Sequence, residues 1–277
     1  MRIDAHQHFW RLARGDYGWL TTEDFPGLYR DFGPSDLASL LDAASIERTV
    51  LVQAAPTAAE TAYLLELAAA TPFVAGVVGW TDLEASDAPG AIESTAANPK
   101  LLGLRPMLQD LDDDAWILRA TVAPALDAMQ RAGLRFDALV KPRHLPNLTK
   151  LLSARPDLRV VIDHGAKPDI AGDALADWAA AMRRIARETS ATCKLSGLVT
   201  EAAPGWREET LRPYVDVLLE AFGPARLMWG SDWPVVNLAG GYAAWHAAAE
   251  ALTERCTADE RADIFGGTAR RFYGIGP

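Results

Sequence analysis

Short apolar runs alternate with longer amphipathic stretches along most of the chain. The short runs are rich in β-branched residues and end at polar or turn-forming residues, a pattern typical of buried parallel strands. They lie at 2–8, 48–54, 74–82, 101–108, 134–141, 159–165, 191–197 and 226–232. Between them apolar residues recur at helical spacing, for example in 35–46, 58–71, 174–189, 210–222 and 243–256. The pattern therefore predicts eight strand–helix units.

Eight such units in 277 residues have the length and order of a (β/α)8 TIM barrel, with one domain over residues 1–277. An open doubly wound sheet is the alternative, but it normally carries a Gly-rich turn after an early strand, and none is visible. We expect Ser35, after Pro34, to be the N-cap of its helix. Gly223-Pro224 is expected to end the helix before the last strand, and 257–277 to form a closing helix and tail.

Two long connections interrupt the regular alternation. Residues 11–33 form an aromatic-rich segment after the first strand, and residues 198–209 follow the seventh strand. In a barrel both would lie on the C-terminal face, where loops close over substrates. Most of their aromatic side chains are expected to pack the loops down.

Composition and charge limit the classes of binding partner and the cellular environment that fit this chain. The net charge is -10 and the pI about 5.0, which argues against nucleic acid or an anionic membrane as a partner. Cys193 and Cys256 lack zinc-type spacing and are interpreted as reduced, buried thiols. Neither a signal peptide nor a long apolar run is visible, so we expect a soluble cytoplasmic protein.

Polar residues stand where the predicted strands end. His6 and His8 are two positions apart on the first strand, so their side chains project to the same face. The other strand ends carry Gln53, Arg105, Lys141, His164 and Asp232, and Lys194 lies on the seventh strand. Because barrel interiors are apolar, ionisable groups collected at one rim indicate an active site.

Asp232 is the candidate general base. It lies in the turn Trp229-Gly230-Ser231-Asp232-Trp233-Pro234, where Trp233 is expected to shield the carboxylate and raise its pKa. A helix cap is the alternative role for Asp232, and a backbone-bonded structural residue is the alternative for His164.

The remaining polar residues are candidates for substrate contacts. Arg105 would be costly on a strand unless it meets an anion or a polarised oxygen. Lys141 and Lys194 either do similar work or reach the rim without any role. His144 either bonds substrate or caps a helix, and Glu201 either binds a hydroxyl or is solvated. His246 lies inside an amphipathic helix, where we expect no chemistry.

Four segments carry a family resemblance. They are DAHQHFW at 4–10, DHGAKPDI at 163–170, CKLSGLVTEA at 193–202 and LMWGSDWPV at 227–235. Together they resemble the lactonase branch of the amidohydrolase superfamily, which includes sugar lactonases and the pyrone-dicarboxylate lactonase. The likeness covers essentially the whole chain. It implies hydrolysis of an aldono-1,4-lactone, with L-fucono-1,4-lactone as first choice and L-rhamnono-1,4-lactone or a dicarboxylate lactone as alternatives.

The resemblance also bears on metal. Many amidohydrolases hold two metal ions with a bridging group from a middle strand, but Arg105 and Lys141 stand at those strand ends here. A two-metal centre is therefore not expected. Either one divalent ion, zinc, is held by His6, His8, His164 and Asp232, or none is needed, as in members of this branch that work without metal.

The mechanism expected from these residues is water attack on the lactone carbonyl. The histidine cluster, directly or through zinc, polarises the carbonyl while Asp232 accepts a proton from water and returns it to the ring oxygen. The expected substrate contacts are Gln53, Arg105, Lys141, His144, Glu201 and Trp233. A metal-dependent decarboxylase of the same superfamily and a catalytically silent barrel are the rival functions. The sequence does not indicate an oligomeric state.

Overall fold

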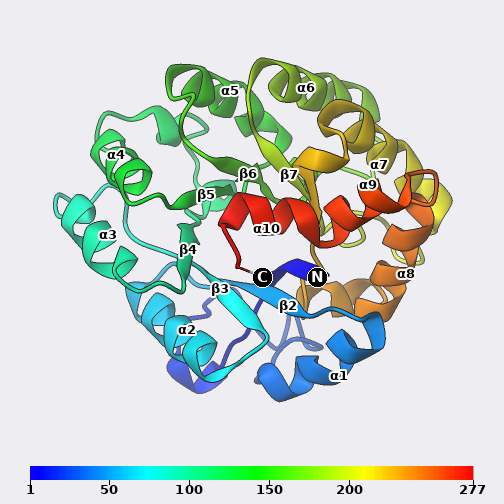
Figure 1. Cartoon of the computed structure of the whole chain (residues 1–277), viewed down its shortest axis with the longest axis horizontal. Coiled ribbons are helices and arrows are strands. Elements are labelled where there is room, and N and C mark those ends of the chain that lie inside the picture. Colours follow the sequence, from blue (N-terminus) through cyan, green and yellow to red (C-terminus); the bar gives the residue numbers. More distant parts are fainter. Residues whose placement is uncertain (277) are drawn as a thin grey trace.

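Eight parallel strands form the centre of the molecule. The computed structural model describes residues 1–276, and its strands pair in the order β1 to β8 (Figure 1). They are β1 (Ile3–Gln7), β2 (Arg48–Val52), β3 (Val74–Gly79), β4 (Leu101–Leu104), β5 (Arg135–Ala138), β6 (Val160–Ile162), β7 (Thr192–Leu195) and β8 (Leu227–Trp229). The segment after β8 bonds to β1 at the rim, since Asp232 N donates to His6 O at 2.8 Å. The predicted (β/α)8 barrel is confirmed.

Helices surround the strands (Figure 1). The outer helices are α1 (Pro34–Ala44), α2 (Ala58–Ala70), α3 (Ala88–Ala96), α4 (Ala123–Arg131), α5 (Leu145–Ala154), α6 (Leu175–Glu188), α7 (Glu208–Phe222) and α8 (Tyr242–Leu252). The chain closes with α9 (Ala258–Ala262), the π-helical turn η8 (Asp263–Gly267) and α10 (Thr268–Tyr273). Short 3₁₀ turns are η1 (Leu12–Arg14), η2 (Leu108–Asp110), η3 (Trp116–Leu118), η4 (Pro142–His144), η5 (Asp163–Ala166), η6 (Pro224–Arg226) and η7 (Val235–Ala239). Among residues 1–276, no helix has both the length and the apolar character needed to cross a membrane.

The start of α1 differs from the expectation. The N-cap is Gly33 rather than Ser35, which lies inside the first turn. Pro34 occupies the first helical turn, where its fixed φ suits the helix and its missing N–H costs nothing. Asp36 then accepts a hydrogen bond from Gly33 N at 2.9 Å, which is the contact that the third helical residue makes in a capping box. The predicted stop at Gly223 is confirmed, with φ of 65° at the helix C-cap.

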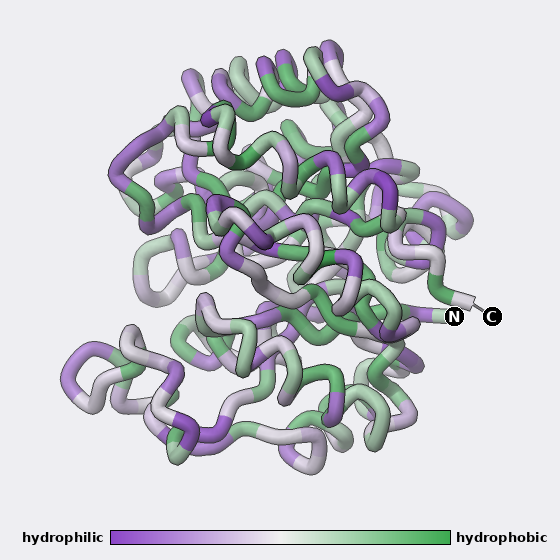
Figure 2. The backbone as a smooth tube through the Cα atoms, turned by 90° about the vertical axis from the view of Figure 1, so that its left-hand side faces the viewer, coloured by the Kyte–Doolittle hydropathy of each residue, from purple (hydrophilic) through white to green (hydrophobic). Residues whose placement is uncertain are grey.

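The apolar core has an outer and an inner part. The outer part fills the space between helices and strands, and hydrophobic and hydrophilic stretches alternate along the outer helices (Figure 2). The inner part lies at the end of the barrel covered by α10 and consists of Ile3, Ala5, Val50, Val52, Val78, Val161, Met228, Ala269, Phe272 and Tyr273. Because α10 and both chain ends lie across this end (Figure 1), it is closed, and an open cavity is left at the opposite end.

Candidate active site

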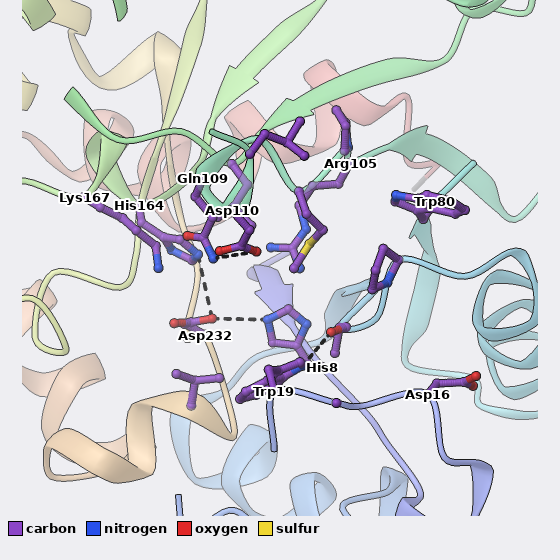
Figure 3. Close-up of a pocket in the computed structure, with 18 of the residues that line it drawn as sticks. His8, Asp16, Trp19, Trp80, Arg105, Gln109, Asp110, His164, Lys167 and Asp232 are labelled. Atoms are coloured by element: carbon purple, nitrogen blue, oxygen red, sulfur yellow. Dashed lines mark hydrogen bonds and ion pairs between the residues drawn. The ribbon is translucent and has the colours of Figure 1, made fainter. Parts of the chain in front are cut away.

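Three histidines and one aspartate from distant segments meet at the C-terminal end of the barrel. His6 and His8 come from the end of β1, His164 from η5 after β6, and Asp232 from the turn after β8. Asp232 Oδ1 lies 3.2 Å from His8 Nε2 and 3.9 Å from His164 Nε2 (Figure 3). It also lies 3.7 Å from His6 Nε2. His6 Nε2 lies 3.2 Å from His8 Nε2. Four groups singled out in the sequence therefore surround one point in space.

Unusual backbone conformations at His164 and Asp232 direct their side chains toward the site. His164 and Asp232 have φ angles of 54° and 58°, in the left-handed region that residues with a Cβ seldom adopt. Ser196 Oγ holds His164 Nδ1 at 2.8 Å, and the next residue is Gly197 with φ of 63°. A Cβ at Gly197 would lie 2.5 Å from His164 Nδ1, so glycine is required for the imidazole to occupy this place.

The electrostatics differ from the sequence expectation at Asp232. Burial alone would raise the pKa of its carboxyl, but the charge interaction with His164 and the hydrogen bond to His8 outweigh burial and hold the pKa below its ordinary value. The predicted rise is therefore wrong. Its physical reason is that imidazoles surround the carboxylate, whereas Trp233 packs elsewhere, with ring centroids 5.3 Å from Phe32 and 6.0 Å from Phe9.

Burial acts in the opposite sense on the histidines. It lowers the pKa of His164 to about 4, although Asp232 and Asp163 oppose the shift. It also holds the pKa of His6 well below the ordinary value, and the Lys194 charge adds to the effect. At neutral pH the site therefore contains an ionised Asp232 beside neutral His6 and His164.

A charged layer lies directly beneath the four groups, inside the barrel. Lys194 Nζ donates to Asp137 Oδ2 at 2.6 Å and to His6 Nδ1 at 3.0 Å, and lies 3.0 Å from Asp163 Oδ1. Tyr273 of α10 donates its hydroxyl to Asp137 Oδ2 at 2.7 Å. The layer lies between the inner part of the apolar core, at the end covered by α10, and the histidines of the site.

The donor set fits a divalent metal ion. One ligand atom each from His6, His8 and Asp232 lies within 4.8 Å of the other two, and His6, Asp163 and His164 form a second, overlapping group. Two imidazoles and a carboxylate are ligands that zinc accepts. His8 has the outer contact usual for a metal ligand, because its Nδ1 donates to Val52 O at 2.8 Å.

A cavity of about 1040 Å³ opens above this floor. His8, His164, Asp232 and Arg105 reach it from the barrel (Figure 3). The loops after β1, β3 and β4 add apolar and aromatic walls that include Trp19, Phe25, Trp80, Met107 and Trp116. The walls are largely apolar but also carry charged side chains, among them Asp16, Glu84 and Lys167, and such a mixture is usual in small-molecule sites.

Two of the predicted substrate contacts line the cavity. Arg105 lies over the histidines, with its Nη1 3.4 Å from His6 Nε2 and 3.5 Å from Asp163 Oδ2. Glu201 lies at the wall with its carboxylate 3.6 Å from Lys167 Nζ.

Four predicted substrate contacts do not line the cavity. Gln53 is buried and donates to Arg105 O at 2.8 Å, so its amide supports the strand ends. His144 accepts from Lys141 N at 3.0 Å, which makes it the capping residue of its turn, while the Lys141 side chain is exposed. Trp233 is 2% exposed within the aromatic core. Each of the four lies near the rim in sequence but turns away from the cavity or is covered.

Several site residues were not singled out in the sequence. Asp137, Asp163 and Ser196 support the floor, and Lys167 lines the cavity. A signal existed for Asp137, since it interrupts the apolar run Phe136-Asp137-Ala138 at a position that β5 buries completely. Lys194, which was weighed as a rim-reaching lysine, is fully buried instead.

The chain is similar to several known proteins over nearly its whole length. The chain is 50% identical to an L-fucono-1,5-lactonase of Burkholderia ambifaria over 278 residues, covering 99% of this chain and 96% of that protein. It is 40% identical to an L-fucono-1,5-lactonase of Burkholderia multivorans over 289 residues, covering 99% and 96%. It also resembles a crystal structure of an amidohydrolase from Burkholderia multivorans with bound zinc, with a TM-score of 0.93, 39% identity and full coverage of both chains.

A family model described as amidohydrolase matches residues 3–275, nearly the whole barrel. The resemblance inferred from the four sequence segments is confirmed, and the chain belongs to the amidohydrolase family.

Proposed function

We propose that the protein hydrolyses the lactone of L-fuconic acid, acting on the 1,5-lactone. The predicted class of enzyme, a lactonase and hence a carboxylic-ester hydrolase, is confirmed by two relatives that carry this name at 50% and 40% identity. The observation that carries the mechanism is the ionised Asp232 facing a cavity beside His8 and His164. The sequence favoured the five-membered 1,4-lactone, but the names of both relatives specify the six-membered ring, so we adopt the 1,5-lactone as first choice.

Asp232 acts on water in the proposed mechanism. Its carboxylate accepts a proton as the water oxygen bonds to the lactone carbonyl carbon, and the carbonyl electron pair moves onto oxygen. The Arg105 guanidinium lines the cavity and carries only hydrogen-bond donors, so it is the group placed to stabilise the developing oxyanion. The carbonyl then re-forms, the bond to the ring oxygen breaks, and Asp232 passes its proton to that oxygen. The product is the open hydroxy acid.

The lowered pKa of Asp232 makes the first proton transfer, from water, harder and the second, to the ring oxygen, easier. A carboxylate with a low pKa is a weak base, so water activation depends on close placement beside an activated ester. Its protonated form is in turn a strong acid, which favours protonation of the departing ring oxygen. The cavity walls confine the sugar ring above the floor, with Lys167 and Glu201 available to its hydroxyls.

We also propose that zinc is the metal that the site would accept, held by His6, His8 and Asp232. A bound ion would supply Lewis-acid polarisation of the carbonyl oxygen.

Acid release from purified protein tests the proposal. A pH indicator follows L-fucono-1,5-lactone, L-fucono-1,4-lactone, L-rhamnono-1,4-lactone and a pyrone-dicarboxylate lactone, each corrected for spontaneous opening, with and without a chelator. We expect the highest kcat/KM with L-fucono-1,5-lactone. Failure to accelerate any sugar lactone would overturn the proposal, and release of carbon dioxide from an aromatic acid would favour the decarboxylase instead.

A further inference from the structure

Glu60 is a fully buried residue in the first turn of α2, and the proposed mechanism does not use it. Its Oε2 accepts hydrogen bonds from Ala55 N at 2.7 Å and from Ala54 N at 3.1 Å, and its Oε1 lies 3.2 Å from Ala54 N. Burying a carboxyl group is unfavourable, and these N–H donors offset the cost. Glu60 therefore fixes the backbone that follows β2.

The two peptide groups that Glu60 holds each carry a cavity residue on their other side. A trans peptide group is planar and its N–H and C=O point in opposite directions, so fixing the N–H also fixes the C=O. In the first group, Ala54 N donates to Glu60 and Gln53 O accepts from Arg105 Nη2. In the second, Ala55 N donates to Glu60 and Ala54 O accepts from Trp19 Nε1 at 2.8 Å. Arg105 and Trp19 both line the cavity, so Glu60 is connected to two of its lining residues.

Gln53 O makes the closest contact with the Arg105 guanidinium. The contacts of Arg105 Nη1 are longer, at 3.4 Å to His6 Nε2 and 3.5 Å to Asp163 Oδ2. Gln53 also holds the main chain of Arg105, because its Nε2 donates to Arg105 O at 2.8 Å. The orientation of the guanidinium thus depends mainly on the peptide group between Gln53 and Ala54.

We propose that Glu60 is a positioning residue that orients Arg105 through the Gln53-Ala54 peptide group. It acts without touching the substrate. Its effect on catalysis rests on the proposed function, because Arg105 is the group placed to stabilise the oxyanion during lactone opening. The second peptide group attaches Trp19, and with it part of the cavity wall, to the same carboxyl group.

The contact does not require a charged carboxylate. Burial raises the pKa of Glu60 to about 7, although the N–H groups of Ala55 and Ala54 oppose the shift. One oxygen, Oε2, accepts both N–H groups, and the carbonyl oxygen of a neutral carboxyl group or of an amide can do the same. Glu60→Gln should therefore keep most of the wild-type kcat. Glu60→Met, which has a similar length but no oxygen acceptor, should not.

A double-mutant cycle tests the role of Glu60. We expect Glu60→Met to lower kcat for L-fucono-1,5-lactone by about 10- to 100-fold, because a small misplacement of an oxyanion donor has effects of this size. In the Arg105→Met background the same substitution should change kcat by less than about twofold, because the group that Glu60 positions is absent. KM should rise equally in both backgrounds, because Trp19 is attached to a different peptide group.

Glu66, exposed on the same helix, offers the matched control Glu66→Met, which should keep full activity. An equal loss of kcat with and without Arg105 would show a purely structural role for Glu60 and would overturn the proposal. A wild-type kcat in folded Glu60→Met would also overturn it. If Glu60→Met does not fold, Glu60→Asp takes its place in the cycle and is judged by the same outcomes, since its carboxylate is retained but is one methylene shorter.

Crystal structures test the positioning without any lactone. In the variant used for the cycle we expect the contact between Arg105 Nη2 and Gln53 O to be lost, and in Glu60→Gln we expect it to be retained. An unmoved Arg105 in the former overturns the positioning role whatever the activity. Protein that opens no lactone but shows this movement of Arg105 loses the proposed function and keeps the positioning role of Glu60.

Discussion

At the scale of single residues, Asp232 illustrates how neighbours override burial. Moving a carboxylate out of water raises its pKa, yet three imidazoles within 3.9 Å of Oδ1 hold the pKa of this one low. The group is consequently ionised throughout the neutral range, and its reactivity depends on placement rather than on a tuned pKa.

Replacing Asp232 by asparagine should remove proton transfer while retaining shape. We expect kcat for lactone opening to fall by about 100- to 10,000-fold, with the far-ultraviolet circular dichroism spectrum unchanged. The exposed Asp112 offers the matched control Asp112→Asn, which should keep full activity. Near-normal turnover by the Asp232 variant would contradict its assignment.

The low pKa of His164 predicts an unusual acid limit. Because the folded pKa is about 4 and the ordinary value 6.5, His164 stays neutral until well below pH 6. We therefore expect kcat/KM to remain level from neutral pH down toward about 4 and then to decline. The same shift favours the folded state above pH 6.5, and this contribution is lost as pH falls toward 4. A kcat/KM profile that turns down near pH 6.5 would show an ordinary histidine instead.

At the scale of elements, the turns after the strands decide the geometry of the site. Strands β6 and β7 end early, at Ile162 and Leu195, and the residues that follow adopt left-handed conformations at His164 and Gly197. The conformation at His164 turns its imidazole toward the cavity, and the glycine at 197 lets the second turn approach that imidazole closely. The strand alternation visible in the sequence carries no information about this approach.

Gly197→Ala tests the close approach. The new Cβ would lie 2.5 Å from His164 Nδ1, so we expect displacement of the imidazole, a large loss of kcat/KM and destabilisation by about 2–4 kcal/mol. Gly205→Ala is the matched control, because Gly205 also has positive φ but has open space around its Cβ position. It should cost about 1–2 kcal/mol of backbone strain and leave activity intact. Equal activity of both variants would show that the turn at Gly197 can shift to accommodate the new Cβ without displacing His164.

At the scale of the whole molecule, the two ends of the barrel have different tasks. Helix α10 closes one end with Phe272 and Tyr273, and the cavity occupies the other. The charged layer of Lys194, Asp137 and Asp163 lies between them. Substitutions at the closed end should therefore affect stability more than turnover.

Tyr273→Phe tests this division. It removes the hydroxyl that donates to Asp137 Oδ2 at 2.7 Å and leaves a buried carboxylate with one donor fewer. We expect the free energy of unfolding in urea to fall by about 1–2 kcal/mol with KM unchanged. Tyr29→Phe, at an exposed position, should change neither quantity. A rise in KM without loss of stability would connect the closed end to the substrate.

The sequence by itself determined the barrel and the four residues that meet at the candidate site. Strand and helix periodicity depend on local spacing, so all eight strands could be located, and the parallel barrel brings their carboxyl ends to one rim. His6, His8, His164 and Asp232 followed from that rule.

Only the tertiary structure decided which rim residues face the cavity and what charge they carry. Turns and packing that no periodicity encodes keep three of the predicted contacts, Gln53, His144 and Trp233, out of the cavity lining. The pKa of Asp232 and the contacts of Lys194 depend on groups from other strands. Electrostatic interactions act between neighbours in space, and those neighbours exist only once the barrel has closed.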